Sequence, residues 1–235
     1  MRTPLTAMID HLSRNDIEKV RLSVQSFGFG LLSSSIVPSV LTGLQEEAGE
    51  RKGVASLAEQ SEDLKYRANI VPLGPKARDF LCSRQLTELL SAVFGGSFVL
   101  TEHRSCLTFY EEGDHLGPHL DKPAEECVVT IIVCVAALGP DWRSPQSGLE
   151  LRVYGQELAG DRKTLLTIPT HTGDIVIGHG SKFWHERPTL QKDEQVAALT
   201  GCYSFAKCLN DTAVDRMHSS ELPDDPSTSS TETVG

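Results

Sequence analysis

Apolar residues in the N-terminal part of the chain recur at helical spacing, which predicts three helices. The first is expected over 13–26, where Ser13 is a candidate N-cap and the apolar positions form a partial stripe. A second helix is expected over 40–51, after a Val-Pro-Ser turn. The third is expected over 76–94, because a Gly-Gly pair beginning at Gly95 follows its last apolar position and ends it.

Further along the chain the pattern changes to short apolar runs separated by Gly, Pro and Asp turns, which is typical of β-strands. Strands are expected at 27–32, 98–101, 104–110, 127–137, 149–154, 164–168, 174–178 and 196–206. Helices followed by many short strands predict an α+β protein whose β part closes into a barrel or sandwich. The polar segment 52–69 has no period and is expected to form a mobile loop over a site.

The length and composition predict one globular domain. The 235 residues are 39% hydrophobic and 23% charged, which is ordinary for a soluble protein with a substantial core. We place this domain at 1–210. The segment 211–235 is rich in Ser, Thr and Asp and poor in apolar residues, so it is expected to be a disordered C-terminal tail.

The charge of the chain bears on its partners and location. A formal net charge of −10 argues against binding to nucleic acid or anionic membranes, which requires a basic surface. Apolar stretches stay below the roughly 18 residues that a membrane-spanning helix needs, and the N-terminus lacks the apolar core of a signal peptide. A cytoplasmic protein is therefore expected, and its oligomeric state is left open.

The cysteines suggest neither a metal site nor a nucleophile. They are Cys82, Cys106, Cys127, Cys134, Cys202 and Cys208. No Cys-x-x-Cys spacing occurs among them, and most lie in or beside apolar runs. We expect them to be reduced thiols that pack as small hydrophobic side chains.

The most informative motif is His119-x-Asp121, with a further histidine, His185, much later in the chain. Side chains at i and i+2 lie on one face of an extended segment, so His119 and Asp121 can reach one metal ion. Two imidazoles and one carboxylate are the ligands of mononuclear Fe(II) oxygenases and leave coordination positions open for chemistry. The remote histidine must then come from another strand. His179, six residues before His185, is its rival.

Several motifs occur in one order along the chain: Tyr110, His119-x-Asp121-x-Pro123, an apolar strand, Ser147–Tyr154, Gly173-Asp174 and Trp184-His185. This order resembles the Fe(II)/2-oxoglutarate-dependent dioxygenases, and within them the prolyl-hydroxylase-like branch. The resemblance covers roughly 10–206. It implies a double-stranded β-helix, or jelly-roll barrel, with the N-terminal helices packed on it.

The resemblance also implies the roles of particular residues. Fe(II) would be held by His119, Asp121 and His185, because the family's last ligand follows the loop after the Gly-Asp strand, often behind an aromatic residue. Tyr110 is similar to a family tyrosine that contacts the cosubstrate or substrate. Packing of this ring within a strand is an equally open interpretation of Tyr110.

One element of the family pattern is missing. The family usually carries an Arg or Lys about ten residues after the distal histidine, where it pairs with the distal carboxylate of 2-oxoglutarate. Here Gln195 or Val196 stands at that place. Arg187, two residues beyond His185, is the first candidate to replace it. Less direct candidates are Lys192, Arg104 and Arg152.

The function implied by the resemblance is that of an Fe(II)/2-oxoglutarate-dependent dioxygenase. It would use dioxygen to oxidise a C–H bond of a small-molecule metabolite, by hydroxylation or by desaturation or cyclisation. Halogenation is disfavoured, because the family's halogenases lack the carboxylate that Asp121 supplies. Three alternatives stay open, namely a 2-oxoglutarate-independent iron oxygenase, a protein prolyl hydroxylase and a non-catalytic metal-binding barrel. The identity of the substrate cannot be derived from the sequence.

Overall fold

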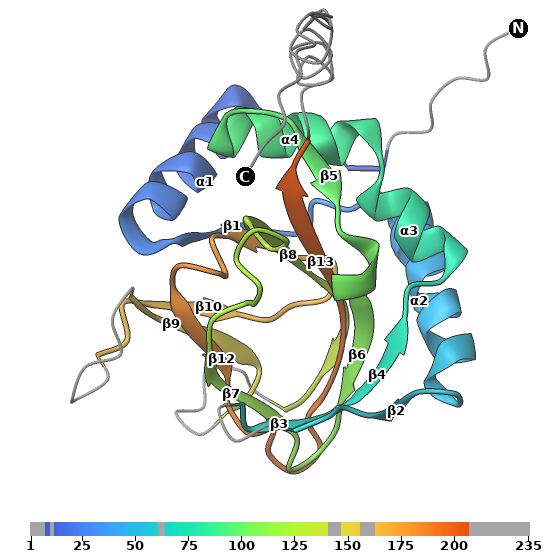
Figure 1. The fold of residues 1–235 in the computed structure, drawn as a ribbon. Coiled ribbons are helices and arrows are strands. Elements are labelled where there is room, and N and C mark those ends of the chain that lie inside the picture. Colours follow the sequence, from blue (N-terminus) through green and yellow to red (C-terminus); the bar gives the residue numbers. More distant parts are fainter. Residues whose placement is uncertain (1–7, 10–11, 61–63, 141–146, 156–162, 207–235) are drawn as a thin grey trace, which may run out of the picture. The chain divides into compact units, whose positions relative to one another are not determined.

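Helices cover one face of a large antiparallel sheet, and a smaller sheet lies opposite its other face (Figure 1). The computed structural model describes residues 8–9, 12–60, 64–140, 147–155 and 163–206. The helices in these ranges are α1 (Arg14–Phe27), α2 (Pro38–Lys52), α3 (Pro75–Leu81) and α4 (Arg84–Phe94), with a 3-10 turn, η1 (Glu102–Arg104).

The strands form two sheets with antiparallel pairing. The larger sheet has the order β1 (Phe29–Leu32), β11 (Ile175–Gly178), β8 (Val129–Leu138), β13 (Gln195–Phe205), β6 (Cys106–Tyr110), β4 (Asn69–Pro72) and β2 (Ser56–Leu57), and β5 (Phe98–Leu100) also pairs with β13. The smaller sheet has the order β10 (Leu166–Pro169), β9 (Glu150–Gly155), β12 (Trp184–Arg187), β7 (His115–His119) and β3 (Tyr66–Arg67). Two facing sheets of this kind form a double-stranded β-helix, so the predicted α+β barrel with helices packed on it is confirmed.

The first helix follows from its local sequence. Ser13 and Asp16 form a capping box, in which each side chain accepts from the backbone N–H of the other residue. Gly28 ends the helix with φ +82°, a left-handed conformation that glycine adopts without strain. Val20 and Val24 are buried, and the helix packs along β1. The prediction of a helix with Ser13 as its N-cap is confirmed.

The single helix expected over 76–94 is wrong. The chain forms α3 and α4 instead, with a break at Cys82 and Ser83. The Ser83 side chain accepts from the backbone N–H of Leu86 at 3.3 Å and starts a new helix. The apolar spacing continues across this break, so the hydrophobic pattern does not reveal it.

Glu47 of α2 supports the start of α3. Its carboxylate is buried and accepts from the backbone N–H groups of Lys76 (2.7 Å) and Ala77 (2.9 Å). A side chain at Gly74 would overlap this carboxylate, so glycine leaves it room. The first N–H groups of a helix have no partner within the helix, so they need acceptors such as this carboxylate.

We expect Glu47→Ala to lower the free energy of unfolding by about 1–3 kcal/mol, because two buried donors lose their acceptor. Urea denaturation measures the change. The control is Glu46→Ala on the same helix, where an exposed carboxylate pairs with the Lys76 ammonium at 2.9 Å. Its effect should stay within about 0.5 kcal/mol. Equal losses in the two variants would contradict the capping role of Glu47.

Successive side chains of β8 point alternately to the core beneath the helices and to the interior of the barrel. Val129, Ile131 and Val133 are fully buried in the core cluster beneath the helices. Thr130 and Ile132 point to the opposite face and line the cavity between the sheets. One mostly apolar strand therefore contributes to two environments.

The segment 52–69 contains strands and was wrongly expected to be irregular. β2 and β3 lie within it, and β4 begins at its end. β3 pairs with β7 and β4 pairs with β6, so this segment extends both sheets. Two other strands, β7 and β12, were also missed. These short strands lack apolar alternation and depend on their partners for their conformation.

Two of the cysteines correct the expectation of reduced thiols. Cys127 and Cys202, 75 residues apart, form a disulfide. The turn before β8 and the strand β13 bring them together, and their spacing carries no signal of this pairing. Cys134 is a buried free thiol, as expected, whereas Cys82 is exposed.

Residues up to Phe205 belong to one compact unit. The expected disordered tail, 211–235, lies outside the described residues, so that expectation and the domain boundary at 210 stay predictions. Among the described helices, none has the length and apolar character needed to cross a bilayer.

Candidate metal centre

Pairing of β7 with β12 brings the two predicted histidine ligands together. His119 and His185 are direct partners in the register of these antiparallel strands. Their ring centroids lie 4.2 Å apart. His119 is the last residue of its strand, whereas His185 lies inside β12 rather than in a loop.

Asp121 completes a group of three potential metal donors. Its Oδ1 lies 3.3 Å from Nε2 of His119 and 3.8 Å from Nε2 of His185. The three donor atoms are all within 4.8 Å of one another. The structure thus brings together His119, Asp121 and His185, as the sequence predicts, in an arrangement that a single metal ion can occupy.

Both imidazoles are oriented by the backbone. Nδ1 of His119 lies 3.0 Å from the carbonyl oxygen of Gly117, and Nδ1 of His185 lies 3.0 Å from that of Phe183. A proton on Nδ1 donates to each carbonyl and leaves the Nε2 lone pair toward the centre of the group. Metal-binding histidines are commonly held in this way.

The electrostatics of the site keep His185 and Asp121 unprotonated. Burial, together with the nearby His119, lowers the pKa of His185 to about 4. Burial by itself would raise the pKa of the Asp121 carboxyl, but His185, His119 and the Thr130 hydroxyl together hold it below its usual range. A neutral imidazole and a carboxylate are the forms that donate electron pairs to a cation.

Two residues that the sequence interpretation missed position Asp121. The Thr130 hydroxyl donates to Oδ2 of Asp121, and the Asp121 backbone N–H donates to the carbonyl of Gly180. Any side chain at position 180 would overlap the Asp121 carboxylate. Thr130 carried a signal, since it is a polar residue inside an apolar run. Gly180 carried none.

Thr130→Val should lower Fe(II) affinity by about 10–100-fold, the usual effect of removing a hydrogen bond to a metal ligand. Valine keeps the shape of threonine, so the barrel should keep its stability. Anaerobic calorimetric titration with Fe(II) measures the affinity. Thr108→Val is the control, because Thr108 lines the same cavity but its hydroxyl contacts Tyr66 and Cys106 rather than Asp121. An equal loss in both variants would exclude a specific role for Thr130.

The rival His179 is not part of this group. Its Nδ1 lies 3.2 Å from the carbonyl oxygen of Val128, and its ring meets Phe94 edge-on at 4.8 Å. It therefore packs beside α4. The choice of His185 over His179 agrees with this placement, and their roles in metal binding stay a prediction.

The donor group lies in the wall of a cavity of about 770 Å³ between the two sheets. Apolar walls come from residues such as Ile132, Leu116 and Leu151, and two tyrosines, Tyr66 and Tyr110, also line it. A volume of this size is typical of small-molecule sites.

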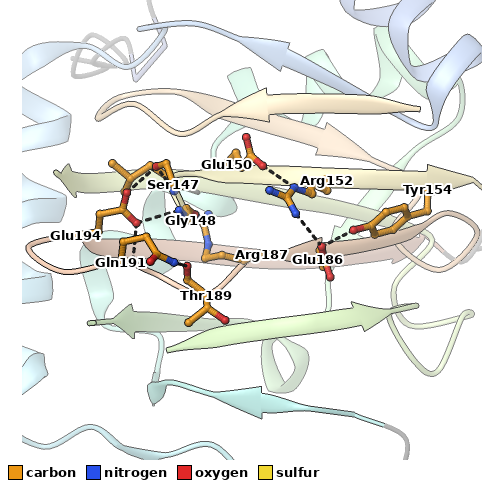
Figure 2. A network of polar contacts seen from close by, with 11 residues as sticks. Ser147, Gly148, Glu150, Arg152, Tyr154, Glu186, Arg187, Thr189, Gln191 and Glu194 are labelled. Atoms are coloured by element: carbon orange, nitrogen blue, oxygen red, sulfur yellow. Dashed lines mark hydrogen bonds and ion pairs between the residues drawn. The ribbon is translucent and has the colours of Figure 1, made fainter. Parts of the chain in front are cut away.

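Arg187 lies in the same cavity, two residues beyond His185 on β12. Only 5% of the residue is exposed, so it is not a solvated loop arginine. Its Nη1 donates to Oγ1 of Thr170 at 3.2 Å and to the carbonyl of Gly148 at 3.4 Å. No ion pair to a carboxylate forms within the described ranges. Its neighbours are drawn in Figure 2, where Glu194 bonds to Ser147 and Gly148 rather than to Arg187.

Solved structures share this arrangement of sheets. The non-heme alpha ketoglutarate dependent epimerase SnoN from nogalamycin biosynthesis matches with a TM-score of 0.67 at 13% identity, over 95% of each chain. A Trichoplax adhaerens prolyl hydroxylase with a hypoxia inducible factor peptide matches with 0.61 at 19%, over 87% of this chain and 93% of its own. Pseudomonas putida prolyl-4-hydroxylase matches with 0.59 at 16%, over 81% and 100%.

The chain has the fold of the 2-oxoglutarate-dependent Fe(II) oxygenases. No family sequence model matches it. No curated protein matches it in sequence either. The likeness is therefore one of structure, and a Burkholderia pseudomallei member of the 2OG-Fe(II) oxygenase family shows it too, with a TM-score of 0.56 at 16% identity over 85% of this chain and 95% of its own.

Within this oxygenase fold, the other cations suggested by the sequence are less suitable anchors for a buried anion. Arg152 lies on the outer face of β9 and pairs with Glu150 and Glu186 (Figure 2). Arg104 lies at the cavity but donates to Glu126 at 2.7 Å. Lys192 is exposed in the turn before β13. Among the described residues, Arg187 is the buried cation of the barrel whose N–H donors have no carboxylate partner.

Tyr110 lies beside Arg187 in the barrel. The Arg187 guanidinium carbon is 5.2 Å from the Tyr110 ring centroid. Burial raises the pKa of Tyr110 to about 12, so the phenol stays protonated and can donate a hydrogen bond. Tyr66, which the sequence interpretation missed, stands next to it with ring centroids 6.4 Å apart.

Proposed function

We propose that this protein is an Fe(II)- and 2-oxoglutarate-dependent dioxygenase that oxidises a C–H bond of a small molecule. The observation that carries the proposal is the convergence of His119, Asp121 and His185 in a cavity that also contains a buried arginine without a carboxylate partner among the described residues. The oxygenase fold supports it, and the SnoN epimerase has been solved in complex with Fe3+ and alpha ketoglutarate.

His119, Asp121 and His185 fit the metal by donor type and by approach. Each directs one donor atom to a common point, and backbone carbonyls or Thr130 hold each donor group in place. Three protein ligands on one side leave the opposite side of an octahedral ion free for small ligands. The three donor residues line the cavity, from which small ligands could reach the ion.

Arg187 and Tyr110 fit the distal carboxylate of 2-oxoglutarate. A buried guanidinium needs an anionic partner to offset its desolvation. Among its described neighbours Arg187 finds the Thr170 hydroxyl, the Gly148 carbonyl and the Tyr110 side chain, but no carboxylate. The Tyr110 hydroxyl supplies a neutral donor beside it. This arrangement would take the place of the Arg or Lys that is absent at Gln195 and Val196.

When bound, iron and 2-oxoglutarate supply the oxidation itself, in which decarboxylation to succinate and carbon dioxide is coupled to oxidation of a substrate C–H bond by dioxygen. The protein's own residues would orient the two carboxylates of 2-oxoglutarate and exclude water. Ile132 and Leu151 form apolar walls around the space where the cosubstrate would lie. A fixed substrate position beside the metal then selects the bond that reacts.

A 2-oxoglutarate-independent oxygenase has no use for a buried, unpaired cation, so Arg187 favours the 2-oxoglutarate-dependent function. A small substrate is favoured by the size of the cavity, about 770 Å³. We keep a protein prolyl hydroxylase as the second candidate, because two of the structural neighbours are prolyl hydroxylases.

The test is succinate formation by the Fe(II)-loaded protein from 2-oxoglutarate, followed by mass spectrometry with and without candidate substrates. Slow succinate release without substrate, increased by a small-molecule substrate, is the expected result. Increase by proline-containing peptides alone would favour the protein hydroxylase. Iron binding without any 2-oxoglutarate binding or turnover would contradict the proposal and favour a non-catalytic or 2-oxoglutarate-independent barrel.

A further inference from the structure

Two cations stand at the mouth of the cavity. Arg104 ends η1 and Lys122 follows Asp121 directly, and both line the cavity and are exposed to solvent. Lys122 forms no ion pair within the part of the chain that the structure describes. Among the described residues, Asp121 is the only acidic one that lines the cavity, and it belongs to the candidate metal site. On a chain with formal net charge −10, this mouth is locally cationic.

Glu126 holds this part of the mouth together. Its Oε2 accepts from Nε of Arg104 at 2.7 Å and lies 3.1 Å from Nε2 of His103. Its carbonyl accepts from the Thr101 hydroxyl at 2.8 Å. The turn that carries Lys122 is thereby tied to η1. Within the described ranges, the terminal nitrogens of Arg104 donate to no acceptor, so they stay available as donors.

The charges inside the cavity balance without these cations. Fe(II) and Arg187 would contribute three positive charges, and Asp121 with 2-oxoglutarate would contribute three negative ones. Glu126 offsets one of the two positive charges at the mouth. One positive charge therefore faces the space that the substrate must enter, close to a part of the protein with low dielectric, where an opposite charge is attracted most strongly.

The same entrance also offers apolar surface. Leu64, Leu120 and Trp184 line the cavity and are each half-buried. Leu120 stands in the sequence between His119 and Asp121, two of the three proposed metal ligands. Half-buried apolar side chains of this kind contact the apolar part of a ligand, and they form no hydrogen bonds with polar groups. A neutral, strongly polar substrate such as a free sugar would leave them unmatched.

We propose that the substrate is a small organic anion with an apolar body, whose anionic group lies against Arg104 and Lys122. This inference rests on the proposed function, since it describes the substrate of that same site. The anionic group binds at the mouth, and the apolar body extends past Trp184 toward the metal. A guanidinium and an ammonium recognise a carboxylate or a phosphate ester alike, so both belong to the class.

The test compares three probes with a common apolar body: 4-phenylbutyrate, phenethyl phosphate and 4-phenylbutyramide. Binding is measured by calorimetry under anaerobic conditions on protein saturated with Fe(II) and 2-oxoglutarate, so that an acid cannot occupy the cosubstrate site. At least one anion should bind about tenfold more tightly than the amide, equivalent to about 1.4 kcal/mol. This preference should weaken as salt is added. The better anion shows whether the group is a carboxylate or a phosphate.

Variants locate the recognition. Arg104→Gln and Lys122→Gln should each reduce the preference for the anion several-fold, and the double variant should remove it. The matched controls are Arg84→Gln, an exposed arginine that likewise pairs with one glutamate, and Lys19→Gln on α1. Both controls should keep the preference and the basal turnover of 2-oxoglutarate.

The outcomes separate this inference from the proposed function. Protein that binds Fe(II) and 2-oxoglutarate, but binds the amide as well as either anion or binds neither anion, overturns the inference alone. An anion preference that survives in the double variant overturns the assignment to Arg104 and Lys122. Failure to bind Fe(II) or 2-oxoglutarate at the start counts against the proposed function instead.

Discussion

Replacement of His185 by alanine is expected to remove most Fe(II) affinity, whereas His179→Ala should leave it nearly intact. Even partners of metal ligands typically contribute about 10–100-fold to affinity, so the loss of a ligand should exceed about 100-fold. The two histidines are six residues apart, but only His185 directs a nitrogen to Asp121, at 3.8 Å. Anaerobic titration with Fe(II), read by calorimetry, measures both variants.

His179→Ala also controls for packing. Each imidazole contacts a phenylalanine ring, with centroid distances of 4.9 Å from His185 to Phe29 and 4.8 Å from His179 to Phe94. Each alanine variant therefore loses a similar aromatic contact, and thermal unfolding without metal shows whether the losses match. Loss of iron from His179→Ala, with His185→Ala still metallated, would show that the distal ligand has been assigned to the wrong histidine.

Arg187→Ala should raise the 2-oxoglutarate concentration needed for half-maximal turnover by at least about tenfold while Fe(II) binding persists. Loss of one partner from a buried, hydrogen-bonded charge pair costs about 2–5 kcal/mol, and about 1.4 kcal/mol corresponds to tenfold. Succinate formation at varied 2-oxoglutarate measures the effect. Arg187→Met, which keeps more of the side-chain volume, should behave like Arg187→Ala if charge is the cause.

Arg152→Met is the control on the neighbouring strand. Arg152 points to the outer face of the smaller sheet, where it already pairs with Glu150, while Arg187 points inward (Figure 2). Its replacement should leave the 2-oxoglutarate requirement unchanged. An unchanged requirement in Arg187→Met as well would exclude Arg187 as the anchor and turn attention to Arg104.

The sequence alone predicted which residues could serve as metal donors, but not the strand pairing and hydrogen bonds that position them. Residue types suffice to suggest a metal, because two imidazoles and a carboxylate suit Fe(II) whatever their surroundings. Ser13 marks the start of the first helix, since a cap depends on neighbouring residues only. Long apolar runs such as Val129–Leu138 identify central strands, because a strand that is buried on both faces carries apolar residues at nearly every position.

The tertiary structure decided what depends on partners distant in the chain. The register of β7 with β12 places His185 opposite His119, and no local pattern specifies that register. The same pairing carries Arg187 into the barrel interior, where the loss of water gives its charge a strong preference for an anion. Thr130, Gly180 and the Cys127–Cys202 disulfide likewise acquire their roles only when strands meet. A sequence determines which donors exist, whereas strand pairing and burial determine which of them converge and what they must bind.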